Sequence, residues 1–226
     1  MNLTRLAAIA AISLASISAF ATVYNDAIGD IAASIGSQPH LDITSVVVTN
    51  TATDITFDIS LNGSPIATQW GKYLVFMSTP GSTGDTSVKG NAWTYNISLS
   101  GGANKYIGGW ADQPTSNAQL WTYSGSWSQN STFTSTITST SISYTVALSS
   151  LGLSAGDILK FDVATTGGNT SNGAVDSLTT GAASWDDPTV LTGERYVVQA
   201  VPEPTSMAAL ALGVVVALRR RRTARL

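Results

Sequence analysis

The sequence predicts an all-β fold, namely an antiparallel two-sheet β-sandwich of the jelly-roll or immunoglobulin-like type. Three observations support this prediction: short runs of β-branched and aromatic residues, alternation of apolar and polar residues within those runs, and turn residues between them. Thr, Ser, Gly and Asn are abundant, and none of them favours a helix interior. About ten such runs, roughly a dozen residues apart, are typical of two antiparallel sheets packed face to face. The main helices expected are an N-terminal signal helix and a C-terminal apolar helix.

The run DITFDISLNG at 54–63 shows the strand pattern most clearly. Ile55, Phe57 and Ile59 alternate with polar residues, and the Asn-Gly pair at the end of the run is a hairpin turn signal. The other predicted strands, in chain order, are 41–50, 72–78, 92–100, 105–110, 118–123, 131–137, 141–148, 157–165 and 194–201. The segment LSSLGLSAGD at 148–157 departs from this pattern, and a short helical turn or corner ended by Gly156 is expected there.

Residues 1–21 have the pattern of a secretory signal peptide. Arg5 precedes an apolar run that extends to about residue 17, and the small-residue pattern Ala19-Phe20-Ala21 follows it. Cleavage is therefore expected after Ala21. A membrane anchor would need roughly 20 apolar residues, and this run is too short for that. Residues 22–200 are then expected to form one β-sandwich domain of ordinary size.

Charge and cysteine content narrow the function of this domain. Between residues 22 and 200 the chain has five basic and thirteen acidic residues, which gives a net charge near −8. Such a domain repels phosphate backbones, so nucleic acid is not an expected partner. The chain has no cysteine, which excludes disulfides, thiolate metal sites and a cysteine nucleophile.

The residues suited to catalysis are few, and we predict that the protein is not an enzyme. His40 is the only histidine, and it lies in a proline-containing loop without a partner nucleophile nearby in the sequence. Asp186 and Asp187 are adjacent and are expected to start a turn, while Asp54 and Asp58 lie on the solvent face of a predicted strand. The alternative is a secreted carbohydrate-active enzyme, which would need two carboxylates about 5–10 Å apart in one cleft.

Three early aspartates form a candidate calcium site. Asp26 and Asp30 flank Gly29 in the segment YNDAIGDI, and Asp42 follows in HLDI. Calcium binds six to eight oxygen atoms, often from carboxylates and carbonyls of a glycine-containing loop. The other interpretation is that these residues only cap turns, as Asp commonly does.

The tryptophans are the candidate ligand-binding residues. The chain has six of them, Trp70, Trp93, Trp110, Trp121, Trp127 and Trp185. Trp93 and Trp121 lie within predicted strands, so they are expected in the interior. Trp70, Trp110 and Trp127 lie beside glycine-containing loops, where their flat faces could stack on sugar rings. Core packing of all six is the alternative.

The chain ends in VPEPTSMAALALGVVVALRRRRTARL, which has three parts in a fixed order. They are the triplet Pro202-Glu203-Pro204, an apolar run at 207–218 and the arginines Arg219, Arg220, Arg221 and Arg222. The arginines are expected to stay on the cytoplasmic side of a membrane. Over residues 201–226 the chain resembles the PEP-CTERM sorting tails of Gram-negative bacteria.

This resemblance implies a route for the protein. It would be exported, held transiently in the inner membrane on the periplasmic side by a C-terminal transmembrane helix, and processed by an exosortase near the triplet. Its final location would be the cell surface or the extracellular space. Proteins with such tails are associated with exopolysaccharide and biofilm production.

The body of the chain has a second resemblance, carried by YNDAIGD, HLDITSVVV, DITFDISL, WGKYLVFMST, LGLSAGDILKFDVATTGG and AVDSLTT with the tryptophan that follows it. These segments are similar to secreted β-sandwich domains akin to the family 9 carbohydrate-binding modules and their DOMON relatives. The resemblance implies that Asp26, Asp30 and Asp42 form a calcium-binding opening. It also implies that Asp176 and Trp185 lie in ligand-side or closing loops.

Together these observations predict a non-enzymatic cell-surface or matrix protein that binds or structures exopolysaccharide. Carbohydrate is the expected ligand, and calcium is the candidate cofactor. The alternatives are a secreted carbohydrate-active enzyme and a purely structural matrix protein without a ligand. In the structural alternative, all the tryptophans would be buried.

Overall fold

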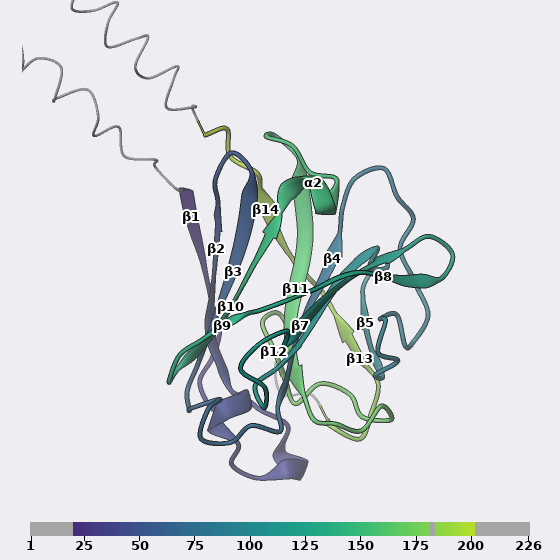
Figure 1. Ribbon diagram of the computed structural model, residues 1–226. Coiled ribbons are helices and arrows are strands. Elements are labelled where there is room, and N and C mark those ends of the chain that lie inside the picture. Colours follow the sequence, from purple (N-terminus) through teal and green to yellow (C-terminus); the bar gives the residue numbers. More distant parts are fainter. Residues whose placement is uncertain (1–19, 181–183, 202–226) are drawn as a thin grey trace, which may run out of the picture.

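The computed structural model describes residues 20–180 and 184–201, which form two large β-sheets packed face to face (Figure 1). Sheet A contains, in spatial order, β1 (Phe20–Asn25), β2 (Ile43–Asn50), β3 (Asp54–Leu61), β10 (Ser141–Ala147) and β9 (Thr136–Ile137). Sheet B contains β12 (Asp176–Ser177), β11 (Ile158–Thr166), β4 (Lys72–Ser78), β6 (Lys105–Trp110), β7 (Ala118–Tyr123) and β8 (Trp127–Phe133), with β14 (Glu194–Val197) also paired to β11. All pairings within these two sheets are antiparallel. The predicted two-sheet antiparallel fold is confirmed.

The remaining elements are short. A parallel pair joins β5 (Ile97–Leu99) to β13 (Thr189–Leu191). The helical segments are η1 (Ala33–Ile35), η2 (Pro39–Leu41) and α2 (Leu148–Leu151). Within residues 20–180 and 184–201, no helix has the length and apolar character needed to cross a membrane. The expected signal helix and C-terminal apolar helix fall outside the described residues.

Most of the predicted strands occur, and three of them, at 72–78, 105–110 and 118–123, have the predicted bounds. The prediction of one strand at 131–137 is wrong, because the chain leaves sheet B after β8 and enters sheet A at β9. The strand expected at 92–100 is reduced to β5. The sequence analysis did not predict β1, β12 or β13.

Asn91 explains why β5 is short. Its Oδ1 accepts the backbone N–H groups of Trp93 (3.2 Å) and Tyr95 (3.1 Å), and its Nδ2 donates to the carbonyls of Tyr95 (2.9 Å) and Ile97 (2.8 Å). Thr94 takes a φ of 61° within this loop. A buried side chain that bonds to its own neighbouring backbone competes with a strand ladder. Residues 92–96 therefore form a loop in place of the predicted strand.

The turn at 148–157 also ends earlier than expected. The helix α2 stops at Gly152, not at Gly156. Gly152 has a φ of 70°, and its N–H bonds to the carbonyls of Leu148 and Ser149. A glycine in this left-handed conformation is a common helix C-terminus.

The main core lies between sheets A and B. Inward side chains of β2 and β3, such as Val48 and Phe57, meet inward side chains of β4 and β11, such as Val75 and Phe161. Phe57 and Phe161 are in direct ring contact, with centroids 5.5 Å apart. Because these positions alternate with polar residues in sheet A, the outer face of that sheet is left to solvent.

Sheet B is covered on its outer face as well. Leu74 and Phe76 of β4 alternate with its inward residues and pack in a second apolar cluster with Tyr95, Ile97 and Leu191. The loop at 80–104 and the β5–β13 pair supply this third layer. Burial on both faces explains why β4 has a continuous apolar run, KYLVFMS, in place of strict alternation.

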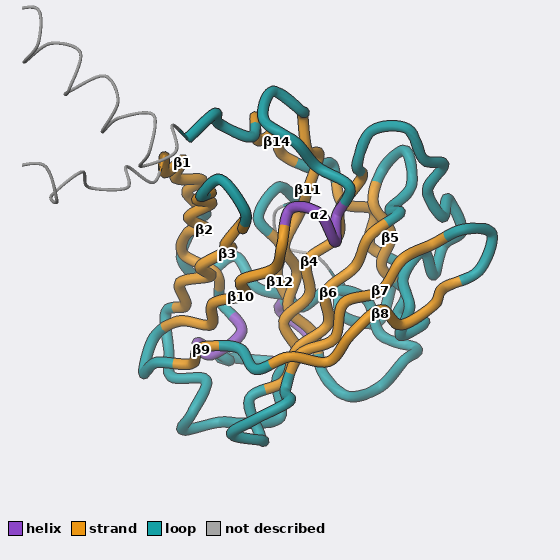
Figure 2. Tube along the Cα trace, turned by 45° about the horizontal axis from the view of Figure 1, so that its top comes forward, coloured by secondary structure: helices purple, strands orange, loops and turns teal. Residues whose placement is uncertain are grey.

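The sandwich has two distinct ends (Figure 2). The described chain begins at Phe20, which pairs with Asn50. The Asn50 side chain accepts the backbone N–H of Gln199 (2.9 Å) and donates to its carbonyl (3.0 Å), close to the last described residue. We call this the tail end. The opposite end, which we call the distal end, contains η1, η2 and the connections that follow β3, β6 and β8 (Figure 1).

We predict that Gly109→Ala destabilises the fold. A Cβ at this position would lie 2.0 Å from the Tyr144 hydroxyl oxygen and 2.7 Å from the adjacent ring carbon, inside the main core. Overpacking of this kind costs about 1–3 kcal/mol, which lowers the melting temperature by about 2–4 °C for each kcal/mol in a domain of this size. Thermal unfolding followed by circular dichroism measures this change in melting temperature. Gly168→Ala is the matched control, since a Cβ there meets no atom within 4 Å.

Candidate metal centre and aromatic platform

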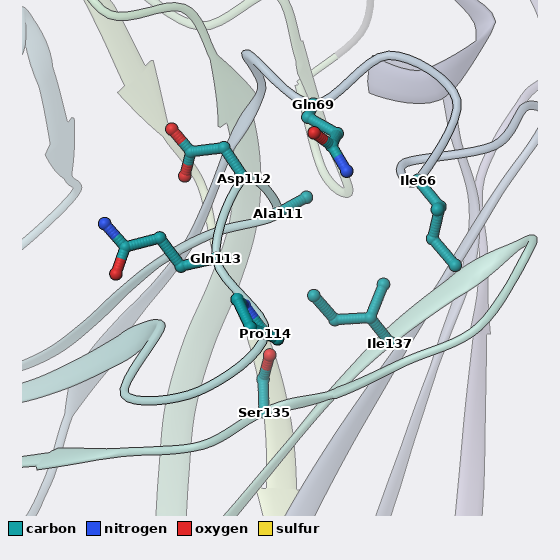
Figure 3. A pocket seen from close by; sticks show the side chains of 8 residues that line it. All are labelled: Ile66, Gln69, Ala111, Asp112, Gln113, Pro114, Ser135 and Ile137. Carbon is teal, nitrogen blue, oxygen red and sulfur yellow. The ribbon is translucent and has the colours of Figure 1, made fainter.

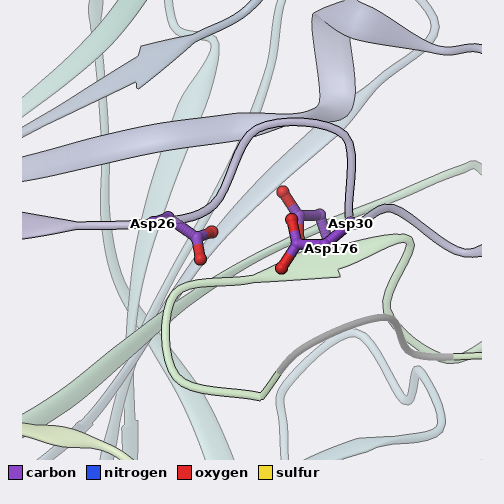
Figure 4. Close-up of side chains that lie close together, drawn as sticks. All are labelled: Asp26, Asp30 and Asp176. Atoms are coloured by element: carbon purple, nitrogen blue, oxygen red, sulfur yellow. The ribbon is translucent and has the colours of Figure 1, made fainter.

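Three carboxylates converge at one side of the sandwich (Figure 4). Asp26, Asp30 and Asp176 each offer one oxygen atom, and these atoms lie within 4.8 Å of one another. Asp26 directly follows β1, Asp30 lies in the turn after it, and Asp176 begins β12. Since β1 is the edge strand of sheet A and β12 the edge strand of sheet B, this carboxylate cluster joins the edges of the two sheets.

The carboxylate cluster contains unsatisfied oxygen atoms. Oδ2 of Asp26 and Oδ1 of Asp30 are buried and have no hydrogen-bond partner among the described residues. Asp176 is held in place by the backbone, because its Oδ2 accepts the N–H of Ile43 (2.6 Å) and its Oδ1 accepts that of Ser177 (2.8 Å). Backbone donors therefore fix the Asp176 carboxylate, and each of the other two carboxylates has one buried oxygen atom without a partner among the described residues.

Burial and mutual repulsion change the acidity of these groups. Burial raises the pKa of Asp26 to about 7 and that of Asp176 to about 8, and it also raises the pKa of Asp30. The neighbouring carboxylates add to each shift, because a like charge disfavours ionisation. A bound cation would favour the ionised carboxylates and reverse these shifts.

Asp42, the predicted third ligand, does not belong to the carboxylate cluster. Asp42 is 2% exposed, and its carboxylate accepts the N–H of Gly29 (3.1 and 3.0 Å) and the side-chain amide of Asn62 (2.9 Å). It therefore holds the turn between Asp26 and Asp30, in which Gly29 has a φ of 85°. The structure brings Asp176 into the carboxylate cluster in its place. Asp176 lies on β12, not in a loop, and no spacing in the sequence connects it to the early aspartates.

The carboxylate cluster is suited to a hard divalent cation. Calcium takes oxygen ligands at about 2.3–2.6 Å and accepts mono- or bidentate carboxylates. Three carboxylates from two sheet edges would supply part of that shell, and backbone carbonyls and water would complete it.

A group of aromatic side chains covers the outer face of sheet B. We call it the aromatic platform, and its members are Trp93, Trp110, Trp121, Tyr123 and Trp127, all partly buried. Their rings are linked through Tyr106 beneath them: Trp93 lies 5.7 Å from Trp110 and 5.8 Å from Tyr106, and Trp127 lies 6.0 Å from Tyr106 and 5.4 Å from Tyr123, measured between ring centroids.

Specific contacts hold the rings in place. Gln119 accepts the indole N–H groups of both Trp93 (3.0 Å) and Trp121 (3.1 Å) at its Oε1. Trp127 donates its indole N–H to Asp85 (2.9 Å). Trp93 lies directly on Gly108, where a Cβ would come within 2.5–2.7 Å of its ring. The platform is therefore fixed in shape before any ligand arrives.

The predicted loop tryptophans are divided between two places. Trp110 ends β6 and Trp127 begins β8, so both belong to strands and to the platform. Trp70 is 39% exposed and lies away from it, in edge contact with His40 (4.9 Å) and near Trp185 (6.4 Å). His40 itself is buried, which lowers its pKa.

Trp93, Trp121 and Tyr123 are platform residues that sequence reasoning did not select. Trp93 and Trp121 were expected in the interior, and they pack against the second apolar cluster while remaining partly exposed. The alternation in β7 predicts that Trp121 and Tyr123 lie on the same face of the sheet. The sequence does not show that this face is partly open to solvent.

The predicted PEP-CTERM tail is recognised in a comparison with known protein families. Ala19 and the residues from Pro202 to Arg222 lie outside the described residues, while Ala21 pairs with Thr49 in sheet A. The PEP-CTERM protein-sorting motif matches residues 200–222. The chain carries a PEP-CTERM motif. This motif supports export and membrane-anchored sorting before release, with processing by an exosortase.

A comparison with curated proteins finds none similar to this chain. The resemblance of residues 22–200 to carbohydrate-binding modules therefore stays a prediction.

We predict that calcium stabilises the fold. A ligand at one hundred times its Kd adds about 2.7 kcal/mol to the free energy of unfolding, or about 5–10 °C in melting temperature for a domain of this size. Thermal unfolding in calcium and in EDTA measures the difference. Asp30→Asn should remove most of the calcium response, whereas Asp186→Asn, an exposed residue outside the carboxylate cluster, should keep it. Equal melting temperatures in calcium and EDTA would contradict the metal site.

A second prediction concerns pH in the absence of metal. The pKa values of Asp26 and Asp176 in the folded state, about 7 and about 8, exceed the value of about 3.9 for an unfolded aspartate. The folded state then binds more protons than the unfolded state, so stability is lost as pH rises through 7 and 8. In EDTA the melting temperature should fall between about pH 6.5 and 8.5.

Calcium should reduce this fall, because it binds the ionised carboxylates. A smaller fall should remain, since burial also raises the pKa of Asp162 on β11 to about 7. The lowered pKa of His40 acts at lower pH and does not disturb the chosen range. A melting temperature that is constant or rises over this range in EDTA would show that the carboxylates are ionised without metal.

Proposed function

We propose that the protein is a non-enzymatic, exported protein that binds extracellular polysaccharide along the aromatic platform. The observation that supports this proposal is the continuous series of rings on one face of sheet B, from Trp110 to Tyr123. The sorting motif at 200–222 supplies the route of export. In this proposal the protein is held on the periplasmic side of the inner membrane and then reaches the cell surface or the extracellular space.

The chemistry of the platform fits a sugar chain. An indole or phenol ring has a flat apolar face with a polar edge, which matches a sugar ring that has C–H groups on its faces and hydroxyls around it. The rings extend along β6, whose six residues span about 20 Å. That length fits several units of an extended polysaccharide better than a single sugar.

Rigidity and charge also support the proposal. Because Gln119 and Asp85 already bind the indole N–H groups of three tryptophans, little side-chain freedom is lost on binding. The net charge near −8 of residues 22–200 favours a neutral polymer over a polyanion.

The carboxylate cluster favours an additional role for calcium. We place the cation between Asp26, Asp30 and Asp176, where it would fasten the edge of sheet A to the edge of sheet B. This role is structural and does not require the cation to contact the polysaccharide.

We predict that the double variant Trp110→Ala, Trp127→Ala weakens binding to the exopolysaccharide of the producing cell. Each aromatic contact contributes about 0.5–1.5 kcal/mol, so the two together should cost about 5- to 150-fold in affinity. Affinity electrophoresis of the full-length chain through gels that contain the polysaccharide measures this effect, with the melting temperature as a check on folding.

Trp70→Ala is the matched control, because Trp70 is more exposed but lies outside the platform. It should bind as the unmodified protein does. Retention of full affinity by the double variant would refute the platform. A decrease in the molar mass of the polysaccharide on incubation would instead support the carbohydrate-active enzyme.

A further inference from the structure

The sandwich holds the chain up to the residue before the sorting motif. The motif matches residues 200–222. Both backbone groups of Gln199 are bound by one side chain, because its N–H donates to Oδ1 of Asn50 (2.9 Å) and its carbonyl accepts from Nδ2 of Asn50 (3.0 Å). Val198 is 1% exposed, and its backbone N–H and carbonyl bond to the connection between β10 and β11 (2.9 and 2.8 Å). The fixed part of the chain therefore ends directly before the first matched residue.

Release of Gln199 from the sandwich is unfavourable. Asn50 is 1% exposed and makes two further hydrogen bonds, since its Nδ2 donates to the Thr51 carbonyl (2.8 Å) and its Oδ1 accepts the Tyr196 hydroxyl (2.6 Å). If Gln199 left, a buried amide would lose two of its partners, which disfavours the open arrangement. A processing enzyme therefore meets the motif with Gln199 in place.

The motif has little reach beyond this point. Pro202, the first residue of the Pro-Glu-Pro triplet, follows Gln199 by three positions. Even a fully extended chain places the two residues at most about 11 Å apart. This reach is close to the distance of about 10 Å between two packed sheets. An exosortase that holds the triplet must therefore lie against the tail end of the sandwich.

The tail end has a cavity of about 400 Å³. It lies between the turn that joins β2 to β3 and the connection from β10 to β11, which contains α2. Figure 1 shows α2 at the same end of the sandwich as the start of β1. A hydrogen bond from the Leu148 N–H to the Thr53 carbonyl (2.8 Å) joins the two segments. The residues that line the cavity are Ala52, Thr53, Asp54, Ala147, Leu148, Ser149, Leu153, Ser154 and Ala155.

The chain leaves the sandwich beside both borders of this cavity. One border is at Ala52, two residues after Asn50. The other border is at Ala155, directly before Gly156, whose N–H bonds to the Val198 carbonyl (2.8 Å). The two residues that hold the end of the fixed chain are therefore the neighbours of the two borders.

The surface around the cavity is small in its side chains and almost uncharged. Asp54 is the one charged residue in the segments 52–54 and 147–155, and its Oδ2 accepts the Thr53 hydroxyl (2.6 Å). Lys105 donates to the Ser150 carbonyl (2.9 Å) from outside these segments. Anionic lipids are recognised by clusters of basic side chains, which this surface lacks. It is suited instead to close packing against an uncharged part of a protein.

We propose that the tail end of the sandwich, at residues 52–54 and 147–155, is a surface that the exosortase contacts while it processes the motif. The enzyme then binds the folded domain as well as the motif. This inference goes beyond polysaccharide binding, and it does not depend on the aromatic platform.

The test is the rate at which the full-length chain is processed in the producing cell, measured by pulse labelling and the loss of mass that accompanies removal of the motif. The double variant Ala52→Arg, Ala155→Arg should be processed at least about fivefold more slowly, because long charged side chains disfavour a close contact. Both alanines are exposed, so the substitutions leave the fold intact, and circular dichroism of the purified chain checks this.

The opposite charge separates an enzyme from a lipid surface. The double variant Ala52→Glu, Ala155→Glu should slow processing to a similar extent, since a clash with a protein surface does not depend on the sign of the charge. If the arginine variant is processed faster and the glutamate variant more slowly, attraction to anionic lipid accounts for the effect and the proposal is wrong.

A cavity at the distal end provides the matched control (Figure 3). Gln69 and Gln113 are exposed and line this cavity of about 360 Å³, which is formed in part by the β3–β4 loop and the β6–β7 turn. The double variant Gln69→Arg, Gln113→Arg adds the same charge at the end opposite to the motif. It should be processed at the rate of the unmodified chain.

A linker tests whether the short reach of the motif causes the contact. About eight Gly and Ser residues inserted between Gln199 and Ala200 add a mean reach of about 15 Å and leave the matched motif intact. In chains with this linker, Ala52→Arg, Ala155→Arg should be processed within about twofold of the rate without these substitutions. An unchanged rate for the double variants without the linker, or equal slowing with and without it, would overturn the proposal.

Discussion

The close approach of aromatic rings to both faces of sheet B depends on two adjacent glycines in β6. On the inner face, Gly109 leaves room for the ring of Tyr144, whose hydroxyl donates to the Tyr73 carbonyl (3.1 Å) and so connects sheet A to sheet B. On the outer face, Gly108 leaves room for Trp93, on which Trp110 packs. Consecutive strand residues face opposite sides, so this pair serves the main core and the platform at once. The packing between the sheets and the shape of the candidate binding face are therefore set at the same point of one strand.

The other side of the sandwich is closed by polar contacts. Thr165 donates its hydroxyl to the Leu41 carbonyl (2.6 Å), and the Ile43 N–H bonds to Asp176. These bonds bring the chain before β2 against β11 and β12, and they hold the third carboxylate beside the loop of Asp26 and Asp30. Burial of the three carboxylates, with a smaller contribution from neighbouring carboxylates, disfavours their ionisation in this arrangement, as their raised pKa values indicate. A divalent cation bound by the three carboxylates would compensate their charge and keep the closure.

The sequence predicted those features that depend on local pattern. Alternation in β3 and the apolar run of β4 indicated strands, and the sorting motif was recognisable because its parts are consecutive. Features that depend on distant residues were missed. Asp176 joins Asp26 only because β12 pairs with β11, and a two-residue strand has no pattern of its own. The loop at 92–96 depends on the hydrogen bonds of one side chain, Asn91, and Trp93 lies on the sheet only because residue 108 is glycine.

The position of the sorting motif affects how the candidate sites are presented. Phe20 and Gln199 meet at Asn50, so the motif at 200–222 continues from the tail end of the sandwich. The strands of sheet B run from that end to the distal end, and the platform follows them from Tyr123 to Trp110. A protein held by its motif would present the platform along its side. The platform includes no residue of the motif, so removal of the motif by an exosortase would leave the platform unchanged.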